Sequence, residues 1–180
     1  MKKILLSTSL ALILPLTACA DNAPETTPEP EQTTDAAQSH HHHADGGPAP
    51  EGIVPAANPA YPVGTAVRLT ADHMPGMEGA RATVSGAYDT YAYAVNYAPT
   101  PEGTEHKWVV QEEIDGAGDD RLADGSEIRL IAGHMPGMEG AQATVAFSTD
   151  ETVYTVDYES EGEQIKNHQW VVESEMEPLR

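Results

Sequence analysis

Apolar and polar residues alternate with a period of two along residues 63–114 and again along residues 124–176. This period is typical of strands that bury one face, and neither segment shows a helical period. The pattern therefore predicts four or five short antiparallel strands in each segment. The positions predicted to face inward are Val67, Leu69, Ala82, Val84, Tyr93, Val95, Tyr97, Trp108, Val110, Ile128, Leu130, Ala143, Val145, Tyr154, Val156, Tyr158, Trp170 and Val172. Those predicted to face outward are Arg68, Arg129, Thr155 and Asp157.

The two segments are copies of each other. Residues 73–80, HMPGMEGA, recur unchanged as residues 134–141, at an offset of 61 that becomes 62 in the last predicted strand. The Gly- and Asp-rich residues 115–123 connect the copies. About 52 residues are few for an independent core, so we expect an all-β fold of two tandem, small SH3-like antiparallel barrels packed together.

The first 19 residues have the features of a bacterial lipoprotein signal peptide. Lys2 and Lys3 precede 13 mainly apolar residues, Ile4 to Leu16, which are too few to span a bilayer. The sequence Leu-Thr-Ala-Cys follows, ending at Cys19, the single cysteine of the chain. An ordinary signal peptide with a stray cysteine is the alternative, but the position of Cys19 favours lipidation there. We therefore expect an extracytoplasmic protein that is lipid-anchored to the cell membrane.

Residues 20–62 have the composition of a disordered tether. They contain eight prolines, seven acidic residues, no Lys or Arg, and few large apolar side chains. Such a segment cannot bury enough surface to offset the entropy lost on ordering. It also carries the tract His40, His41, His42 and His43, which is either a weak metal-binding tract or without function.

Composition excludes several classes of function. The formal net charge of −20 disfavours binding to nucleic acid or to anionic lipid headgroups, whereas it suits cations. One cysteine cannot form an intrachain disulfide or a thiolate zinc site. No nucleophile motif or phosphate-binding loop is present, so we expect a protein that is not an enzyme.

Several of these motifs together resemble the YdhK family of bacterial lipoproteins. The shared features are the tandem HMPGMEGA segments, the Tyr-x-Val-x-Tyr strand, the closing His-x-Trp-Val-Val and the acidic lipoprotein leader. The resemblance covers residues 63–176 and implies the architecture and the location of the protein. It implies no activity, because the repeat unit of that family is a domain of unknown function.

The HMPGM segments suggest a site for copper. Pro75 and Gly76 favour a type II turn, which would bring the thioethers of Met74 and Met77 close together, with His73 adjacent. Thioether and imidazole ligands favour Cu(I). His106 and His168 open the last predicted strand of each copy and could supply a further imidazole, with Glu78 or Glu139 orienting a ring. The predicted metal ligands are His73, Met74, Met77, His106, His134, Met135, Met138 and His168.

Two interpretations of these residues are consistent with the sequence. The first is a surface-anchored protein that buffers or delivers copper. In the second, the Met and His residues are structural, and SH3-like modules bind an extracytoplasmic protein or a cell-wall polymer through Tyr93, Tyr97, Trp108 and their counterparts.

Replacing Cys19 with Ser should release the protein from the membrane fraction, because no other segment is apolar enough to hold it there. Fractionation followed by immunoblotting measures this. A variant that stays with the membranes after a high-salt wash would contradict the lipoprotein assignment.

Overall fold

The computed structural model describes residues 45–98 and 105–179. This part of the chain is all-β, as predicted, and carries two short 3-10 helices, η1 and η2. The elements in the first half are β1 Val54–Pro55, β2 Ala66–Leu69, β3 Arg81–Asp89, β4 Ala92–Tyr97, β5 His106–Val110 and η1 Gln111–Glu113. Those in the second half are β6 Glu127–Arg129, β7 Gln142–Thr149, β8 Val153–Ser160, β9 Glu163–Val172, η2 Glu173–Glu175 and β10 Met176–Pro178.

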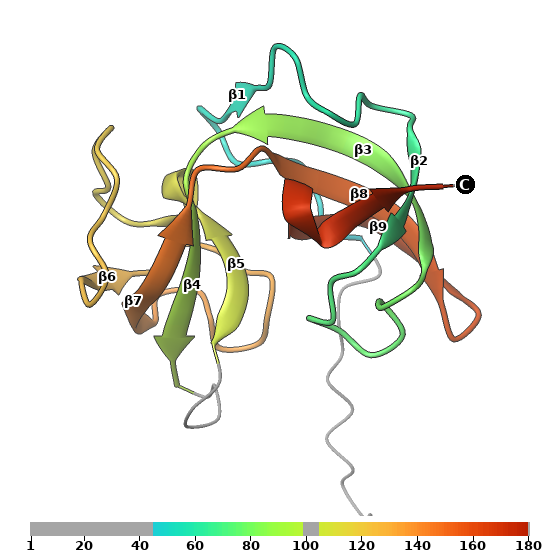
Figure 1. Cartoon of the computed structure of the whole chain (residues 1–180). Coiled ribbons are helices and arrows are strands. Elements are labelled where there is room, and N and C mark those ends of the chain that lie inside the picture. The colour runs from blue at the N-terminus through green and yellow to red at the C-terminus, as the bar shows by residue number, and fades with distance from the viewer. Residues whose placement is uncertain (1–44, 99–104, 180) are drawn as a thin grey trace, which may run out of the picture. The chain divides into compact units, whose positions relative to one another are not determined.

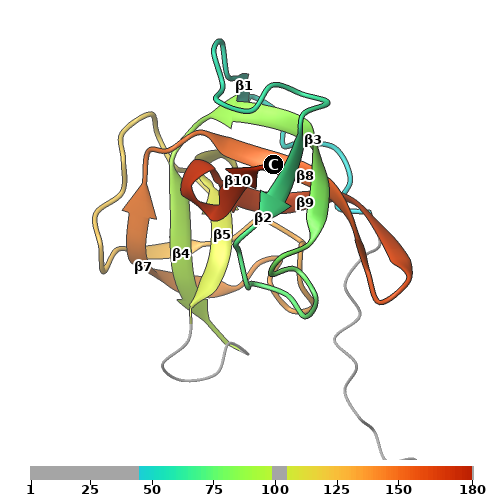
Figure 2. The same cartoon turned by 45° about the vertical axis from the view of Figure 1, so that its right-hand side comes forward.

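The strands form two antiparallel sheets, and each sheet takes strands from both repeats (Figures 1 and 2). Sheet 1 has the order β10-β2-β3-β8-β9, with β1 paired to β3. Sheet 2 has the order β5-β4-β7-β6. Sheet 2 is thus continuous in sequence over residues 92–149, whereas sheet 1 combines residues 54–89 with residues 153–178.

The exchange of strands follows from the similarity of the repeats. Val156 of β8 faces Val84 of β3, and its counterpart Val95 of β4 faces Val145 of β7. A strand therefore finds equivalent partners in either copy. Only Thr90 and Tyr91 separate β3 from β4, and the chain passes there from one sheet to the other.

The residues predicted to face inward are all buried. They form one cluster in each sheet and a third cluster, with Trp108 and Trp170, that contains residues of both sheets. The prediction for Thr155 was wrong, because this residue is only 4% exposed. Thr155 lies on β8, where Val153 to Val156 are all buried, and its hydroxyl accepts a hydrogen bond from Ser85 at 2.9 Å. Central strands bury both faces here, so alternation underestimates their burial.

The predicted tether needs a correction at its C-terminal end. Residues 45–62 are ordered: β1 pairs with β3, and the amide of Ala56 donates to the carbonyl of Ala87 at 2.9 Å. Ala49 and Ile53 pack against the cluster shared by the two sheets, and the hydroxyl of Tyr61 donates to the carbonyl of Met176. The partly buried side chains of Ala49, Ile53, Ala56 and Tyr61 are thus enough to fix this segment between its prolines, because they pack against the core clusters of the sheets.

Residues 1–44, with Cys19 and the tract His40 to His43, lie outside the described part of the chain. Among the residues that are described, none belongs to a helix long and apolar enough to cross a membrane.

Two deletions should distinguish the contribution of residues 45–59 to stability from that of residues 20–44. Deleting residues 20–44 should leave the thermal midpoint unchanged. Deleting residues 20–59 removes β1, Ala49 and Ile53, and should cost about 2 kcal/mol, which lowers the midpoint by roughly 5–10 °C. Calorimetry of both variants measures the difference, and equal midpoints would show that residues 45–59 add nothing to stability.

Candidate functional site

Each HMPGM segment forms the predicted turn. The amide of Met77 donates to the carbonyl of Met74 at 3.1 Å, and Gly76 has a φ of 74°. The second copy repeats this, since Met138 donates to Met135 at 3.1 Å and Gly137 has a φ of 79°. These values fit a type II turn, in which glycine tolerates the positive φ.

The turn separates the two methionines of each motif. Met77 and Met138 are 0% exposed and lie in the cores of sheet 1 and sheet 2. Met74 and Met135 are half-buried: they pack against the same clusters and also line a cavity. The structure thus encloses one methionine of each pair fully in a core, and only Met74 and Met135 remain candidate ligands.

All four histidines of the two repeats line one cavity. It has a volume of about 920 Å³ and is lined by His73, His106, His134 and His168 together with Met74 and Met135. The histidines come from equivalent places in the two sheets, since His73 and His134 follow β2 and β6, while His106 and His168 lie on β5 and β9. Sheet 1 therefore contributes His73, Met74 and His168, and sheet 2 contributes His134, Met135 and His106.

A partly buried carboxylate fixes the orientation of His73. Nε2 of His73 lies 2.7 Å from Oε1 of Glu175, and Oε2 of Glu175 accepts hydrogen bonds from the indole of Trp108 at 2.9 Å and from the amide of Val172 at 3.2 Å. Burial raises the pKa of the Glu175 carboxyl, but the hydrogen bond and charge of His73 and the bonds from Trp108 and Val172 outweigh it, so the pKa is lowered. Glu175 is thus an ionised acceptor at neutral pH.

Glu113 holds His134 in the same way. Nε2 of His134 lies 2.5 Å from Oε1 of Glu113, and Oε2 accepts from Trp170 at 2.9 Å and from the amide of Val110 at 3.0 Å. We call each set a clamp: Glu175 with His73 and Trp108, and Glu113 with His134 and Trp170. In each clamp the glutamate belongs to one repeat and the histidine and tryptophan belong to the other.

The clamps leave one nitrogen of each imidazole without a hydrogen bond. The side chains of His73 and His134 are only 6% and 10% exposed, and Nδ1 of each is buried with no hydrogen-bond partner among the described residues. When Nε2–H donates to a carboxylate, a neutral imidazole keeps a lone pair on Nδ1. A carboxylate behind one ring nitrogen is the usual support of a metal-binding histidine.

A second imidazole lies close to His134. The ring centroids of His106 and His134 are 6.1 Å apart, and Tyr97 contacts His106 edge to face. Because an imidazole nitrogen lies about 2.0–2.1 Å from a bound ion, two rings on one ion have centroids roughly 5–6.5 Å apart. His168, the counterpart of His106, has an equivalent edge-to-face contact with Tyr158.

Over residues 45–98 and 105–179 no three His, Cys, Asp or Glu side chains gather in an arrangement that could hold a metal ion. A site in the cavity would therefore need the thioether of Met74 or Met135 to complete its ligands.

The sequence analysis missed the two clamp glutamates. Glu78 and Glu139, which it named as supports for an imidazole, are exposed. A signal was present, because Val-Val-x-x-Glu ends both repeats, at Val109 to Glu113 and at Val171 to Glu175. The aromatic residues of the interaction-module reading, Tyr93, Tyr97 and Trp108, are buried, so they offer no exposed binding surface.

Comparison with known proteins gives the family. A family model described as "Protein of unknown function (DUF1541)" matches residues 63–111 and again residues 124–173. The uncharacterized protein YdhK of Bacillus subtilis (strain 168) is 45% identical over 175 residues, which cover 93% of this chain and 84% of that protein. The chain therefore belongs to the DUF1541 family, and the resemblance inferred from the tandem motifs is confirmed.

Solved structures of YdhK are similar as well. The crystal structure of this B. subtilis DUF1541 protein gives a TM-score of 0.70 at 49% identity, covering 74% of this chain and 94% of that one. The solution NMR structure of the YdhK C-terminal domain gives a TM-score of 0.60 at 51% identity, covering 65% of this chain and 92% of that one.

Replacing Glu113 or Glu175 with Gln should destabilise the fold by about 2–4 kcal/mol, because each change weakens several hydrogen bonds to a buried carboxylate. The exposed Glu78 and Glu139 give matched controls, and their Gln variants should stay within about 0.5 kcal/mol of the wild type. Urea unfolding measures all four. Equal stability of clamp and control variants would refute the structural role of the clamps.

Proposed function

We propose that this DUF1541 protein is a lipid-anchored, extracytoplasmic protein that binds copper as Cu(I) in the histidine-lined cavity, for buffering or delivery. The ligands of one site are His73, Met74 and His168, and those of the other are His134, Met135 and His106. Each site thus joins the HMPGM loop of one repeat to the last strand of the other.

One observation carries the proposal: the buried Nδ1 atoms of His73 and His134 have no hydrogen-bond partner in the part of the chain that the structure describes, while a glutamate holds Nε2 of each ring. An unsatisfied buried nitrogen normally costs free energy, about 1–3 kcal/mol. A cation bound at each site would satisfy the Nδ1 atom there, and the glutamate that holds Nε2 would support the imidazole as a ligand. The same arrangement in both copies supports a role that the two copies share.

The donor set supports Cu(I) over other ions. Two imidazoles and a thioether are neutral and partly soft, which suits Cu(I), whereas Mg²⁺ and Ca²⁺ require oxygen ligands and structural Zn²⁺ sites usually have four nitrogen or thiolate ligands. Thioethers also keep their ligand character where thiols would oxidise, which fits the extracytoplasmic location expected from Cys19.

Replacing Met74 and Met135 with Leu should leave the protein folded but lower its affinity for Cu(I), because Leu preserves volume and removes the sulfur. Each change should cost under about 1.5 kcal/mol of stability. We expect the wild type to bind about two Cu(I), and the double variant to lose at least the roughly 10- to 100-fold in affinity that loss of a supporting group costs at metal sites. Anaerobic competition with a chromogenic Cu(I) chelator measures both values.

Met77 and Met138 supply the matched control. They belong to the same motifs but lie in the cores, so their Leu variants should keep full Cu(I) affinity. The titrations should use a chain with Cys19→Ser and with His40 to His43 replaced by Ala, so that no other soft or histidine-rich site competes. A wild-type cavity that fails to compete with the chelator, or a Met74→Leu, Met135→Leu variant with unchanged affinity, would end the copper proposal.

A further inference from the structure

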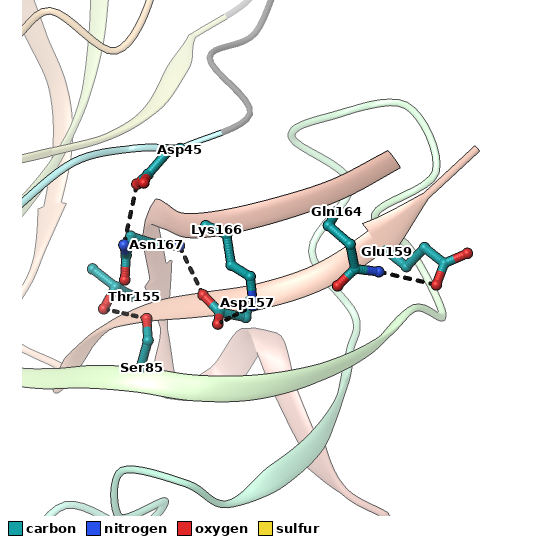
Figure 3. A network of polar contacts seen from close by, with 8 residues as sticks. All are labelled: Asp45, Ser85, Thr155, Asp157, Glu159, Gln164, Lys166 and Asn167. Carbon is teal, nitrogen blue, oxygen red and sulfur yellow. Dashed lines mark hydrogen bonds and ion pairs between the residues drawn. The ribbon is translucent and has the colours of Figure 1, made fainter. Parts of the chain in front are cut away.

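An ordered segment ahead of β1 lies against β9. We call residues 45–50 the strap. The amide of Gly46 donates to the carbonyl of Lys166 at 2.9 Å, and Asp45 forms a parallel bridge with Lys166. The side chain of Asn167 donates to Asp45 Oδ1 at 3.1 Å, as Figure 3 shows, and that of Gln169 donates to the carbonyl of Pro48 at 3.1 Å.

The strap forms part of the cavity wall. Asp45, Gly46, Pro48 and Pro50 line the cavity together with His168 and Gln169. Its hydrogen-bond partners, residues 166, 167 and 169, flank His168 on both sides in β9. The strap is therefore fixed to the strand that carries a ligand of the proposed site in sheet 1.

Among residues 45–98 and 105–179, the repeats provide no second strap for the site in sheet 2. The offset of 61 residues maps residues 45–50 onto residues 106–111, and these already form β5 and the start of η1. The duplication copied the strands and loops of the cavity, but the strap lies outside the repeated unit, ahead of residue 63. The two proposed sites thus have equivalent ligands and different walls.

We infer that the strap makes the two copper sites unequal: Cu(I) held by His73, Met74 and His168 exchanges slowly, and Cu(I) held by His134, Met135 and His106 exchanges readily. This inference rests on the proposed function. A ligand-exchange reaction needs an incoming donor to reach the ion, and a wall segment held to β9 by three hydrogen bonds beside His168 restricts that approach there. The protein would then keep one ion and pass on the other.

Gly46 offers a way to displace the strap without touching any proposed ligand. A Cβ atom at this position would lie 2.1 Å from the carbonyl oxygen of Asn167, which is backbone and cannot move aside cheaply. Gly46→Ala therefore forces the strap away from β9. Gln169→Ala is a second, milder change, because it removes only the hydrogen bond to Pro48.

The test is the release of Cu(I) from the loaded full chain, with Cys19→Ser and His40 to His43 replaced by Ala, after mixing with excess bicinchoninate. We expect two phases of equal amplitude, with rate constants differing by about tenfold or more, which corresponds to about 1.4 kcal/mol in barrier. Met74→Leu should remove the slow phase and Met135→Leu the fast one. Gly46→Ala should accelerate the slow phase toward the fast one, and Gln169→Ala should do so in part.

Two variants serve as controls. Glu51→Ala changes an exposed residue just beyond the strap, and Gln164→Ala changes a glutamine of β9 that bonds to Glu159 instead (Figure 3). Both should release Cu(I) as the wild type does. A single release phase, or a slow phase unaltered in both Gly46→Ala and Gln169→Ala, would overturn the inference and leave the copper proposal standing. Absence of Cu(I) binding in the preceding titration would instead reject the copper proposal itself.

Discussion

Two glutamates, the buried Glu113 and the partly buried Glu175, tie this fold together, and the walls of the cavity depend on them. A carboxylate removed from water is stable only when its oxygens accept enough hydrogen bonds. Each glutamate obtains an amide from its own repeat, and an indole and an imidazole from the other repeat. In each clamp the histidine and glutamate belong to one sheet, whereas the tryptophan comes from the other. The clamps therefore join repeats and sheets simultaneously.

The exchange of strands between the repeats brings the histidine and the glutamate of each clamp together. Because sheet 1 receives β2 and β3 from the first repeat and β8 to β10 from the second, His73 of the first repeat lies beside Glu175 of the second. In sheet 2, His134 of the second repeat lies beside Glu113 of the first. A duplication that leaves each copy to fold alone would give two separate surfaces. Here the copies complete each other, and all four repeat histidines line one cavity.

The sequence was sufficient for the class of fold, the strands, the buried faces and the turn at Pro75 and Gly76, because these depend on local alternation and local turn chemistry. It could not reveal which copy supplies each partner strand, since Val95 and Val156 are interchangeable in pattern. The sequence also predicted that the thioethers of Met74 and Met77 lie close together. A turn brings the Cα atoms close, but it does not determine which of the two side chains is buried in the core. Glu113 and Glu175 were missed because their histidine partners are 21 and 102 residues away in sequence.

The HMPGM segment is retained in both copies because its residues have separate structural tasks, and no single role explains all of it. Met77 fills the core of sheet 1, and Gly76 permits the turn. His73 is held by a glutamate, and its buried Nδ1 has no hydrogen bond with any described residue. Packing alone accounts for Met77 but not for the unsatisfied nitrogen, which lowers stability unless something binds to it. The strap then distinguishes two otherwise equivalent sites, because it precedes the repeated unit and, among the described strands, its hydrogen bonds go to β9. Differences between the sites thus arise from what surrounds the repeats, while their similarity arises from the repeats themselves.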